Sequence, residues 1–542
     1  MTTHFKETTG SAVLDEAHVG PIHGAFGTIH QHDTGARTTW SHKFRTLLAI
    51  LGPGLIVMVG DNDAGAFGTY TQAGQNYGTA LLWTLVLLIP VLYVNQEMVL
   101  RLGAVTGVGH ARLIFARFGR FWGAFSAIDL FLLNGLTIVT EFIGISLALD
   151  YLGLSKPIGI TIAAVLIMAA VSTGDFRRFE RFSMVLILGS LVLVPIFFMV
   201  HPPYAQIAYD LAVPQLPKDG KLSDVMLLII AIVGTTIAPW QLFFQQSYVI
   251  DKRITPRFMR YERADLWIGI VLVVIGAVAM MAFTAATFAG KPEFGQFVDA
   301  GAVAKGIETY AGKLPGVLFA IGLIDASLIG ASAVSLSTAY AVGDCFAIKH
   351  SLHRKVSDAK GFYVVYAGLI IIAAAIVLTP GAPLGLLTNA VQTLAGVLLP
   401  SATVFLLLLC NDKAVLGPWV NTRAGNVFTG AVVALLVMLS VILTASVLFP
   451  DQTDETVILA ILGGGTVIAL VAAAATGVFK RQTEVRAAPK AWKDTWRMPA
   501  IETLPPAELS RASKVWMATL RAYLVISGGL VLAHIITLAI AG

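Results

Sequence analysis

Thirteen stretches of the chain are apolar over a length that can cross a lipid bilayer, and no other feature restricts the fold as strongly. A helix needs roughly 20 residues to cross about 30 Å of hydrocarbon. Membrane strands are excluded because no alternating pattern typical of a β-barrel is present. The stretches cover residues 45–76, 79–101, 121–151, 157–173, 182–200, 224–249, 264–289, 315–346, 362–379, 386–410, 425–449, 456–479 and 514–540.

The composition agrees with a membrane protein and excludes a soluble domain. Hydrophobic residues make up 56% of the chain and charged residues 13%, and the mean hydropathy is +0.78. The two cysteines, Cys345 and Cys410, are too few for a disulfide framework. Residues 1–40 are polar and lack the pattern of a cleavable signal peptide, so we expect the first apolar helix to direct insertion.

Basic residues are concentrated in alternate loops, which predicts the orientation in the membrane. The positive-inside rule places these loops in the cytoplasm. We therefore predict a multi-pass protein of the cell membrane with a cytoplasmic N-terminus. We expect it to act as a monomer in the lipid bilayer and not to bind nucleic acid. The residues are Arg112, Arg117 and Arg120; Arg177, Arg178 and Arg181; Lys252, Arg253, Arg257, Arg260 and Arg263; Lys349, Arg354, Lys355 and Lys360; and Lys480, Arg481, Arg486, Lys490, Lys493 and Arg497.

Two apolar stretches are interrupted by polar, helix-breaking residues at mid-membrane depth. The first is interrupted at Asp61–Gly65 and the sixth at Thr235–Gln241. Because an odd offset of five stretches separates the breaks, the two halves have opposite orientations, which predicts an inverted repeat of five plus five helices with its binding site between the breaks. The alternative is that glycine and proline only kink ordinary helices. Asp61 and Asp63 disfavour it, because intramembrane carboxylates are costly.

The predicted organisation follows from these repeats. It comprises a polar cytoplasmic tail (1–43), a first repeat (44–200), a second repeat (201–410), two further helices (411–480), a basic cytoplasmic linker (481–513) and an additional helix (514–542).

Asp63 is the strongest candidate ligand. A carboxylate beside free backbone carbonyls at a helix break forms a hard oxygen site for a cation. Asp61 and Asn62 are also polar, and the sequence leaves open which of them faces the cavity. Further oxygen donors are predicted at Gly60, Thr235, Thr236 and Gln241.

The breaks contain no Met, Cys or His, the ligands that favour soft or borderline transition metals. Ala238 and Trp240 occupy the second break instead. Carboxylates and carbonyls with room for water suit a small hard ion such as Mg²⁺.

Other polar groups lie inside predicted helices. Gln392 and Glu141 have either a functional or a structural role, and the residues alone do not decide between these. The polar run Asn95–Glu97 is interpreted as a solvated helix end. No GxSxG, HExxH or Walker A motif is present, so we expect a non-enzyme without cofactors.

Over residues 45–480 the chain resembles the NRAMP divalent-metal transporters, whose fold is LeuT-like. Gly52 to Gln72 is similar to the family's first-helix pattern, with Asp63-Ala64-Gly65-Ala66 at the place of Asp-Pro-Gly-Asn. Ala238-Pro239-Trp240 stands at the place of Met-Pro-His, and Gln392 at that of a family glutamine on helix 10. The resemblance implies metal ligation at the positions of Asp63, Ala66 and Ala238, which here retain one side-chain ligand.

The departures from the family pattern concern proton coupling. The places of the family's proton-carrying His and Asp read Trp240 and Ile138, and the predicted ninth helix has no arginine. This combination is similar to the NRAMP-related magnesium transporter branch. The resemblance implies transport of Mg²⁺, and of Mn²⁺ as well, by alternating access without proton coupling.

Two alternatives of function remain. One is a proton-coupled transition-metal (Mn²⁺ or Fe²⁺) importer with other ligands. The other is a sodium-coupled organic solute carrier, because folds with this repeat also carry such solutes. A metal sensor that does not transport is more remote.

Overall fold

The computed structural model describes residues 16–33, 35–217, 220–381, 384–475, 490–507 and 511–541. Within these ranges the regular secondary structure is helical apart from one short hairpin. The first half contains α1 (Trp40–Ile50), α2 (Pro53–Val59), α3 (Ala64–Tyr77), α4 (Leu82–Thr106), α5 (His110–Phe118), α6 (Arg120–Tyr151), α7 (Lys156–Val171), α8 (Phe176–Gly189), α9 (Leu193–Val200) and α10 (Tyr204–Ala212).

The second half contains α11 (Leu222–Thr236), α12 (Pro239–Asp251), α13 (Met259–Phe288), α14 (Ala300–Ala311), α15 (Lys313–Phe346), α16 (Lys360–Leu378) and α17 (Leu384–Asn411). The C-terminal part contains α18 (Lys413–Leu416), α19 (Arg423–Leu448), α20 (Glu455–Ala475), α21 (Lys490–Thr495) and α22 (Arg511–Ala541). Short 3-10 helices are η1 (Glu16–His18), η2 (Ser190–Val192), η3 (Pro256–Phe258), η4 (Gly417–Trp419), η5 (Pro450–Gln452) and η6 (Ile501–Thr503).

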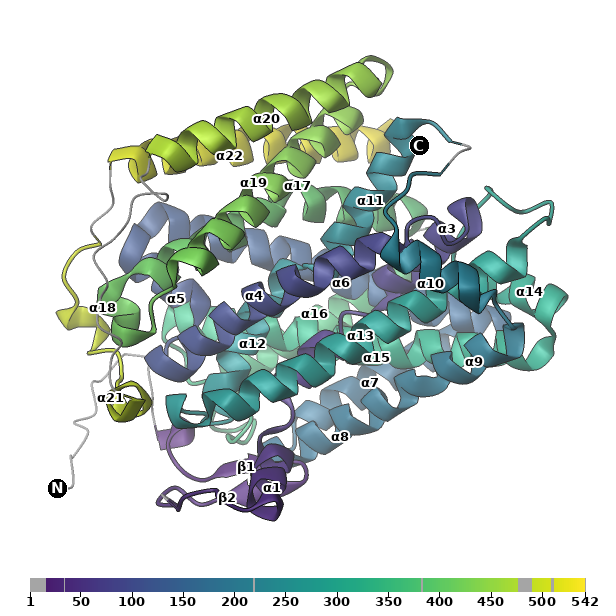
Figure 1. Ribbon diagram of the computed structural model, residues 1–542. Helices are drawn as coiled ribbons and strands as arrows, with labels where there is room; N and C mark the ends of the chain where they lie inside the picture. Colours follow the sequence, from purple (N-terminus) through teal and green to yellow (C-terminus); the bar gives the residue numbers. More distant parts are fainter. Residues whose placement is uncertain are drawn as a thin grey trace.

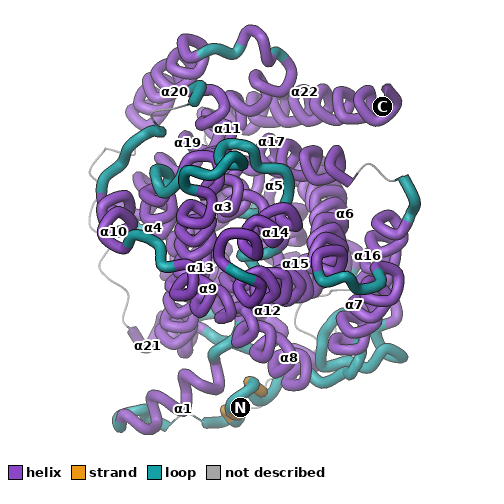
Figure 2. Tube along the Cα trace, turned by 90° about the vertical axis from the view of Figure 1, so that its right-hand side faces the viewer, coloured by secondary structure: helices purple, strands orange, loops and turns teal. Residues whose placement is uncertain are grey.

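Every predicted apolar stretch contains helix, but the number of membrane crossings stays a prediction. In the described part of the chain, eleven helical segments are long and apolar enough to cross a bilayer, or twelve if the bent pair α1–α2 is one span. The helix α7 is shorter, because its apolar run ends at Val171. The protein is an all-α polytopic membrane protein with the predicted LeuT-like inverted repeat. The helices α20 and α22 lie along the side opposite α1 (Figures 1 and 2).

The two predicted breaks are present, and each is short. Residues 60–63 separate α2 from α3, and residues 237 and 238 separate α11 from α12. The chain also bends by 54° between α1 and α2, so the first predicted stretch contains two changes of direction. The sequence did not predict this bend at Leu51–Gly52.

The elements α5, α18, α21 and the hairpin lie at one end of the bundle, and α10 and α14 lie toward the other (Figure 1). The basic loops of the sequence, as far as their residues are described, belong to the first end, which we call the basic end. Its cytoplasmic location remains the prediction of the positive-inside rule.

The segment predicted as a polar tail is folded over its described residues 16–33 and 35–43. The strands β1 (Ile22–Gly24) and β2 (Gly27–Ile29) pair antiparallel, with Ile22 opposite Ile29. Ile22, Ala25 and Ile29 are buried against the hydrophobic core, which gives a polar segment enough apolar contact to dock.

The helix α13 packs closely against α2 at a glycine. A Cβ atom added at Gly54 would lie 2.6 Å from Leu266 Cα and 2.7 Å from Leu266 N, both backbone atoms of α13. Backbone atoms cannot move aside as the end of a flexible side chain can, so the contact requires glycine.

We predict that Gly54→Ala destabilises the protein by about 1–3 kcal/mol through overpacking. The measurement is the thermal unfolding midpoint of purified protein in detergent. Gly135→Ala on α6 is the matched control, because a Cβ there meets no atom within 4 Å, and its midpoint should stay unchanged or rise. Equal midpoints for both variants would contradict the close contact.

Candidate metal site

The break between α2 and α3 is held in place by Asp63. The chain leaves α2 through tight turns in which Asp61 N donates to Met58 O and Asn62 N to Val59 O, both at 3.2 Å. Asp63 is then extended, and its Oδ1 accepts a 2.9 Å hydrogen bond from Ala66 N. Asp63 is therefore the N-cap of α3, which fixes one of its two carboxylate oxygens.

The break between α11 and α12 is built around Pro239. Ala238 is extended and half-buried, and Pro239 occupies the first turn of α12, where its missing N–H leaves no donor unsatisfied. Thr236 Oγ1 lies 2.8 Å from the Tyr70 hydroxyl, and this contact joins α11 to α3. Thr235 is half-buried at the last turn of α11.

Asp61 faces the second break. Its Oδ1 accepts a hydrogen bond from Gln241 Nε2, and its Oδ2 has no hydrogen-bond partner among the described residues. Gln241 Oε1 in turn accepts from Gln96 Nε2 of α4 at 2.8 Å. Since Asp61 is only 1% exposed, this oxygen is a buried acceptor that a cation can satisfy.

Asn62 faces away from the second break. Its Nδ2 donates to Val273 O of α13 at 3.1 Å. Asp61, and not Asn62, thus contacts α12, while Asn62 Oδ1 also has no hydrogen-bond partner among the described residues.

Glu141 of α6 adjoins the first break. Its Oε2 accepts a 3.1 Å hydrogen bond from Ala64 N, its carboxyl interacts electrostatically with Asp63, and its Oε1 is unpartnered within the described ranges. It packs against Gly330 of α15, where an added Cβ would lie 2.8 Å from Glu141 Cδ. Asp63 therefore interacts with two other carboxylates, that of Asp61 and that of Glu141.

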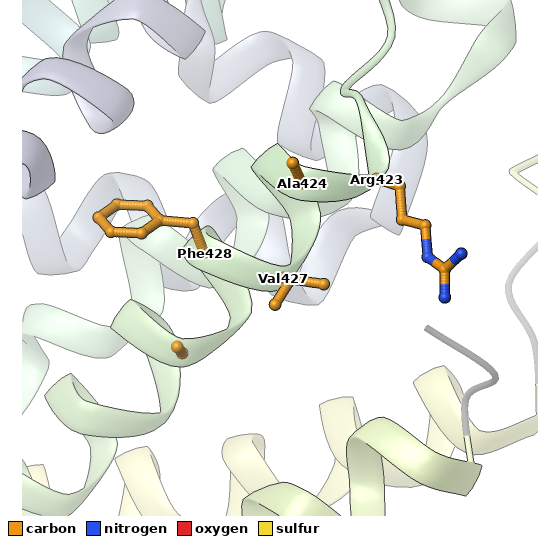
Figure 3. A pocket seen from close by; sticks show the side chains of 5 residues that line it. Arg423, Ala424, Val427 and Phe428 are labelled. Atoms are coloured by element: carbon orange, nitrogen blue, oxygen red, sulfur yellow. The ribbon is translucent and has the colours of Figure 1, made fainter. Parts of the chain in front are cut away.

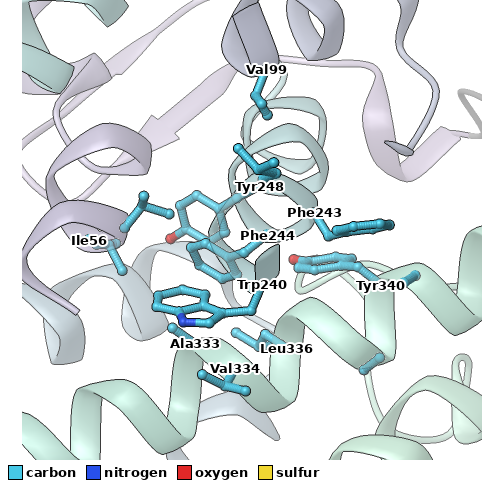
Figure 4. Packing of buried hydrophobic residues seen from close by; sticks show 14 of the residues in the cluster. Ile56, Val99, Trp240, Phe243, Phe244, Tyr248, Ala333, Val334, Leu336 and Tyr340 are labelled. Carbon is cyan, nitrogen blue, oxygen red and sulfur yellow. The ribbon is translucent and has the colours of Figure 1, made fainter. Parts of the chain in front are cut away.

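Trp240 closes the site toward the basic end. Its ring lies against Gly60, where an added Cβ would be 3.6 Å from Trp240 Cη2, and it packs edge-on to Phe244, which stacks on Tyr248 at 5.0 Å. These residues recur every four positions and form one buried face of α12 (Figure 4). That Trp240 lines the cavity stays a prediction, and its ring is buried between Gly60 and Phe244.

Of the remaining predicted site residues, the structure describes some side chains and not others. Ala66 is buried and contributes its N–H to the cap of α3. Gln392 lies in α17, but its side chain is outside the described part of the structure. Within the described ranges, no three His, Cys, Asp or Glu side chains form a group that could hold a metal ion. A cation here would therefore need backbone, amide or water oxygens as well.

Gln96 is a site residue that the sequence reading placed wrongly. The run Asn95–Glu97 was interpreted as a solvated helix end, yet Asn95 and Gln96 are each 1% exposed. Glu97 does not lie at a helix end either, because α4 continues to Thr106, and it forms ion pairs with Arg101 at 3.2 Å and Arg263 at 2.7 Å. The usable signal was two amides next to each other within an apolar stretch.

One surface groove is unrelated to this site. It is an apolar groove of about 730 Å³ on α19, lined by Arg423, Ala424, Val427, Phe428 and Ala431 (Figure 3). None of these residues contributes a carboxylate or an amide.

Both sequence and fold are similar to those of known metal transporters. The family described as "Natural resistance-associated macrophage protein-like" (Nramp) matches residues 54–446. The divalent metal cation transporter MntH of Erwinia tasmaniensis is 26% identical over 412 residues, which cover 72% of this chain and 93% of the relative. MntH of Pectobacterium carotovorum is 27% identical over 361 residues, which cover 62% and 84%. The Eremococcus coleocola manganese transporter has a similar fold, with a TM-score of 0.62 at 22% identity, covering 82% of this chain and 95% of that chain.

We predict that Asp61→Asn weakens the binding of a divalent cation about tenfold or more, which corresponds to about 1.4 kcal/mol, because it removes a charged acceptor from the break. Titration calorimetry of purified protein with Mg²⁺ or Mn²⁺ measures this. Asn62→Ala is the control, since Asn62 faces α13, and its affinity should match that of the wild type. If Asn62→Ala loses affinity and Asp61→Asn does not, Asn62 and not Asp61 is the residue that binds the ion.

Proposed function

This chain belongs to the Nramp family of divalent metal transporters, and we propose that it carries Mg²⁺, and Mn²⁺ as well, by alternating access without proton coupling. The metal ion is the transported substrate and not a resident cofactor. The proposed place of transport is the cell membrane, with the N-terminus in the cytoplasm.

The observation that carries the choice of Mg²⁺ is the donor set at the breaks. Asp61 and Asp63 supply carboxylate oxygens, and Gln241 supplies an amide. Ala66 and Ala238 are small and offer no side-chain ligand. Hard oxygen donors suit Mg²⁺ and also Mn²⁺, whereas softer metal ions prefer sulfur or imidazole.

The absence of proton coupling is proposed from three positions in the sequence. Trp240 replaces an imidazole by a buried ring that cannot carry a proton, Ile138 is apolar, and α16 (Lys360–Leu378) contains no arginine. A proton route built from these elements would lack its titratable groups.

A proton-coupled manganese transporter is the second candidate, and the names of the relatives favour it. MntH is a divalent metal cation transporter, and the Eremococcus coleocola protein is a manganese transporter. One contact also supports it, because Glu141 adjoins Asp63 and the two carboxyls could exchange a proton when an ion binds. An organic anion is disfavoured as substrate, since the three carboxylates at the break would repel it.

We predict that reconstituted protein moves Mg²⁺ into liposomes down its gradient without acidifying the lumen, because the break binds the ion and lacks a proton route. A Mg²⁺ indicator and a pH dye, recorded together, measure this. Asn62→Ala should transport and Asp61→Asn should transport more slowly. If the liposomes take up Mn²⁺ with stoichiometric acidification and take up no Mg²⁺, the uncoupled Mg²⁺ transporter is ruled out. The proton-coupled manganese transporter then takes its place.

We predict that Ala238→Met raises the preference for Mn²⁺ or Cd²⁺ over Mg²⁺ several-fold, because a thioether at the break is a soft ligand. Competition between the ions in the flux assay measures the preference. Ala231→Met, on α11 but outside the break, is the matched control. An unchanged ratio in Ala238→Met would mean that Ala238 does not face the ion.

A further inference from the structure

The N-terminal strap, residues 16–33 and 35–37, lies across the basic end of the helix bundle. It contains η1, β1 and β2, and the two strands lie next to α1 in Figure 1. It precedes the family match, which begins at residue 54. Neither the candidate site nor the proposed transport step uses it, so its extensive contacts require another explanation.

Four arginines of the bundle donate hydrogen bonds to backbone carbonyl oxygens of the strap. Hydrogen bonds from a charged donor are stronger than neutral ones, and backbone acceptors fix the path of the strap and not its composition. The bonds are Arg253 to Ala17 O at 2.7 and 2.9 Å and to Pro21 O at 3.1 Å, Arg181 to Ala25 O at 3.2 Å, Arg257 to Asp33 O at 2.7 Å and to Gly35 O at 3.2 Å, and Arg177 to Gly27 O at 3.4 Å.

A buried ion pair connects the strap to the start of α2. Ala25 N donates to Glu180 Oε2 at 2.5 Å, and Glu180 Oε1 pairs with Lys252 Nζ at 2.5 Å. Lys252 Nζ also donates to Leu51 O at 2.9 Å, at the bend before α2. The side chains of Glu180 and Lys252 are both 0% exposed. The strap thus completes the hydrogen bonds of an ion pair that holds α2, α8 and α12 together.

The same region has to open if an ion leaves Asp61 toward the basic end. Between α2 and α12 the route is filled by Trp240, Phe244 and Tyr248 (Figure 4), so α2 and α12 must separate. Lys252 follows α12 directly and holds the bend before α2, so the ion pair lies at the seam between them.

We propose that the strap is an autoinhibitory lock on the gate at the basic end. While docked it keeps α2 against α12, and it has to release before an ion leaves toward that end. The physical reason is that a buried ion pair is stable only while its remaining hydrogen bonds are satisfied. Release removes the Ala25 N–H from Glu180 and weakens the pair that closes the seam. This proposal rests on the transport function proposed above.

The test uses the full-length chain carrying Arg253→Gln, which removes three hydrogen bonds to the strap. Hydrogen exchange of the α2 amides should become roughly fivefold to tenfold faster, and the initial flux of Mg²⁺ or Mn²⁺ should rise by a similar factor with an unchanged preference between the ions. Arg253→Lys, which keeps a donor, should restore part of the protection. Arg178→Gln is the matched control, because Arg178 is 70% exposed and pairs with Asp175 of the same region.

If Arg253→Gln does not fold, Arg257→Gln provides the same test through the bonds to Asp33 and Gly35. Faster exchange in β1 and β2 without faster exchange in α2 would overturn the lock. Unchanged or slower flux from a released strap would also overturn it. If the wild type moves neither ion, the proposed function fails, but the exchange of α2 still decides whether the strap holds the gate.

Discussion

The structure depends on how two interrupted helices satisfy their backbone at mid-membrane depth, where water is excluded and an unpaired N–H or C=O is costly. At the first break, Asp63 caps the N–H of Ala66 and Glu141 caps that of Ala64. At the second, Pro239 has no N–H to satisfy. The break is therefore stable without a ligand on its amides, and its carboxylates remain available for an ion.

The sequence predicted the breaks and Asp63 because both leave local signals, namely polar residues within apolar runs. It could not separate Asp61 from Asn62, since the direction of each side chain depends on the turns after α2. Gln96 was misplaced because its partner Gln241 is 145 residues away, and only the packing of α4 against α12 brings them together. The docking of the strap was even harder to predict from the sequence. Its main contacts are hydrogen bonds from arginine side chains to backbone carbonyls, and such bonds leave no side-chain pattern in the strap.

The negative charge of the carboxylates at the break gives a physical reason for a cation to bind there. Asp61, Asp63 and Glu141 are buried. Among the described residues, Asp61 accepts a hydrogen bond from the Gln241 amide, and Asp63 and Glu141 accept from the backbone N–H groups of Ala66 and Ala64. Buried carboxylates require protons or cations for charge balance. Mg²⁺ and Mn²⁺ both provide this balance, so the selection between them depends on the neutral ligands. Ala238 contributes no thioether, which removes the main preference for the softer ion.

The helix α2 connects the ion site to the strap. It has seven residues, all of them buried, and is about 10 Å long at 1.5 Å per residue. Its C-terminal end leads to Asp61, and its N-terminal end is held by Asp265 through Gly52 and Gly54 and by Lys252 through Leu51. An ion near the C-terminal end of α2 and the strap near its N-terminal end would therefore both act on the position of this helix. By linkage, strap docking then changes ion affinity by the same factor as ion binding changes docking.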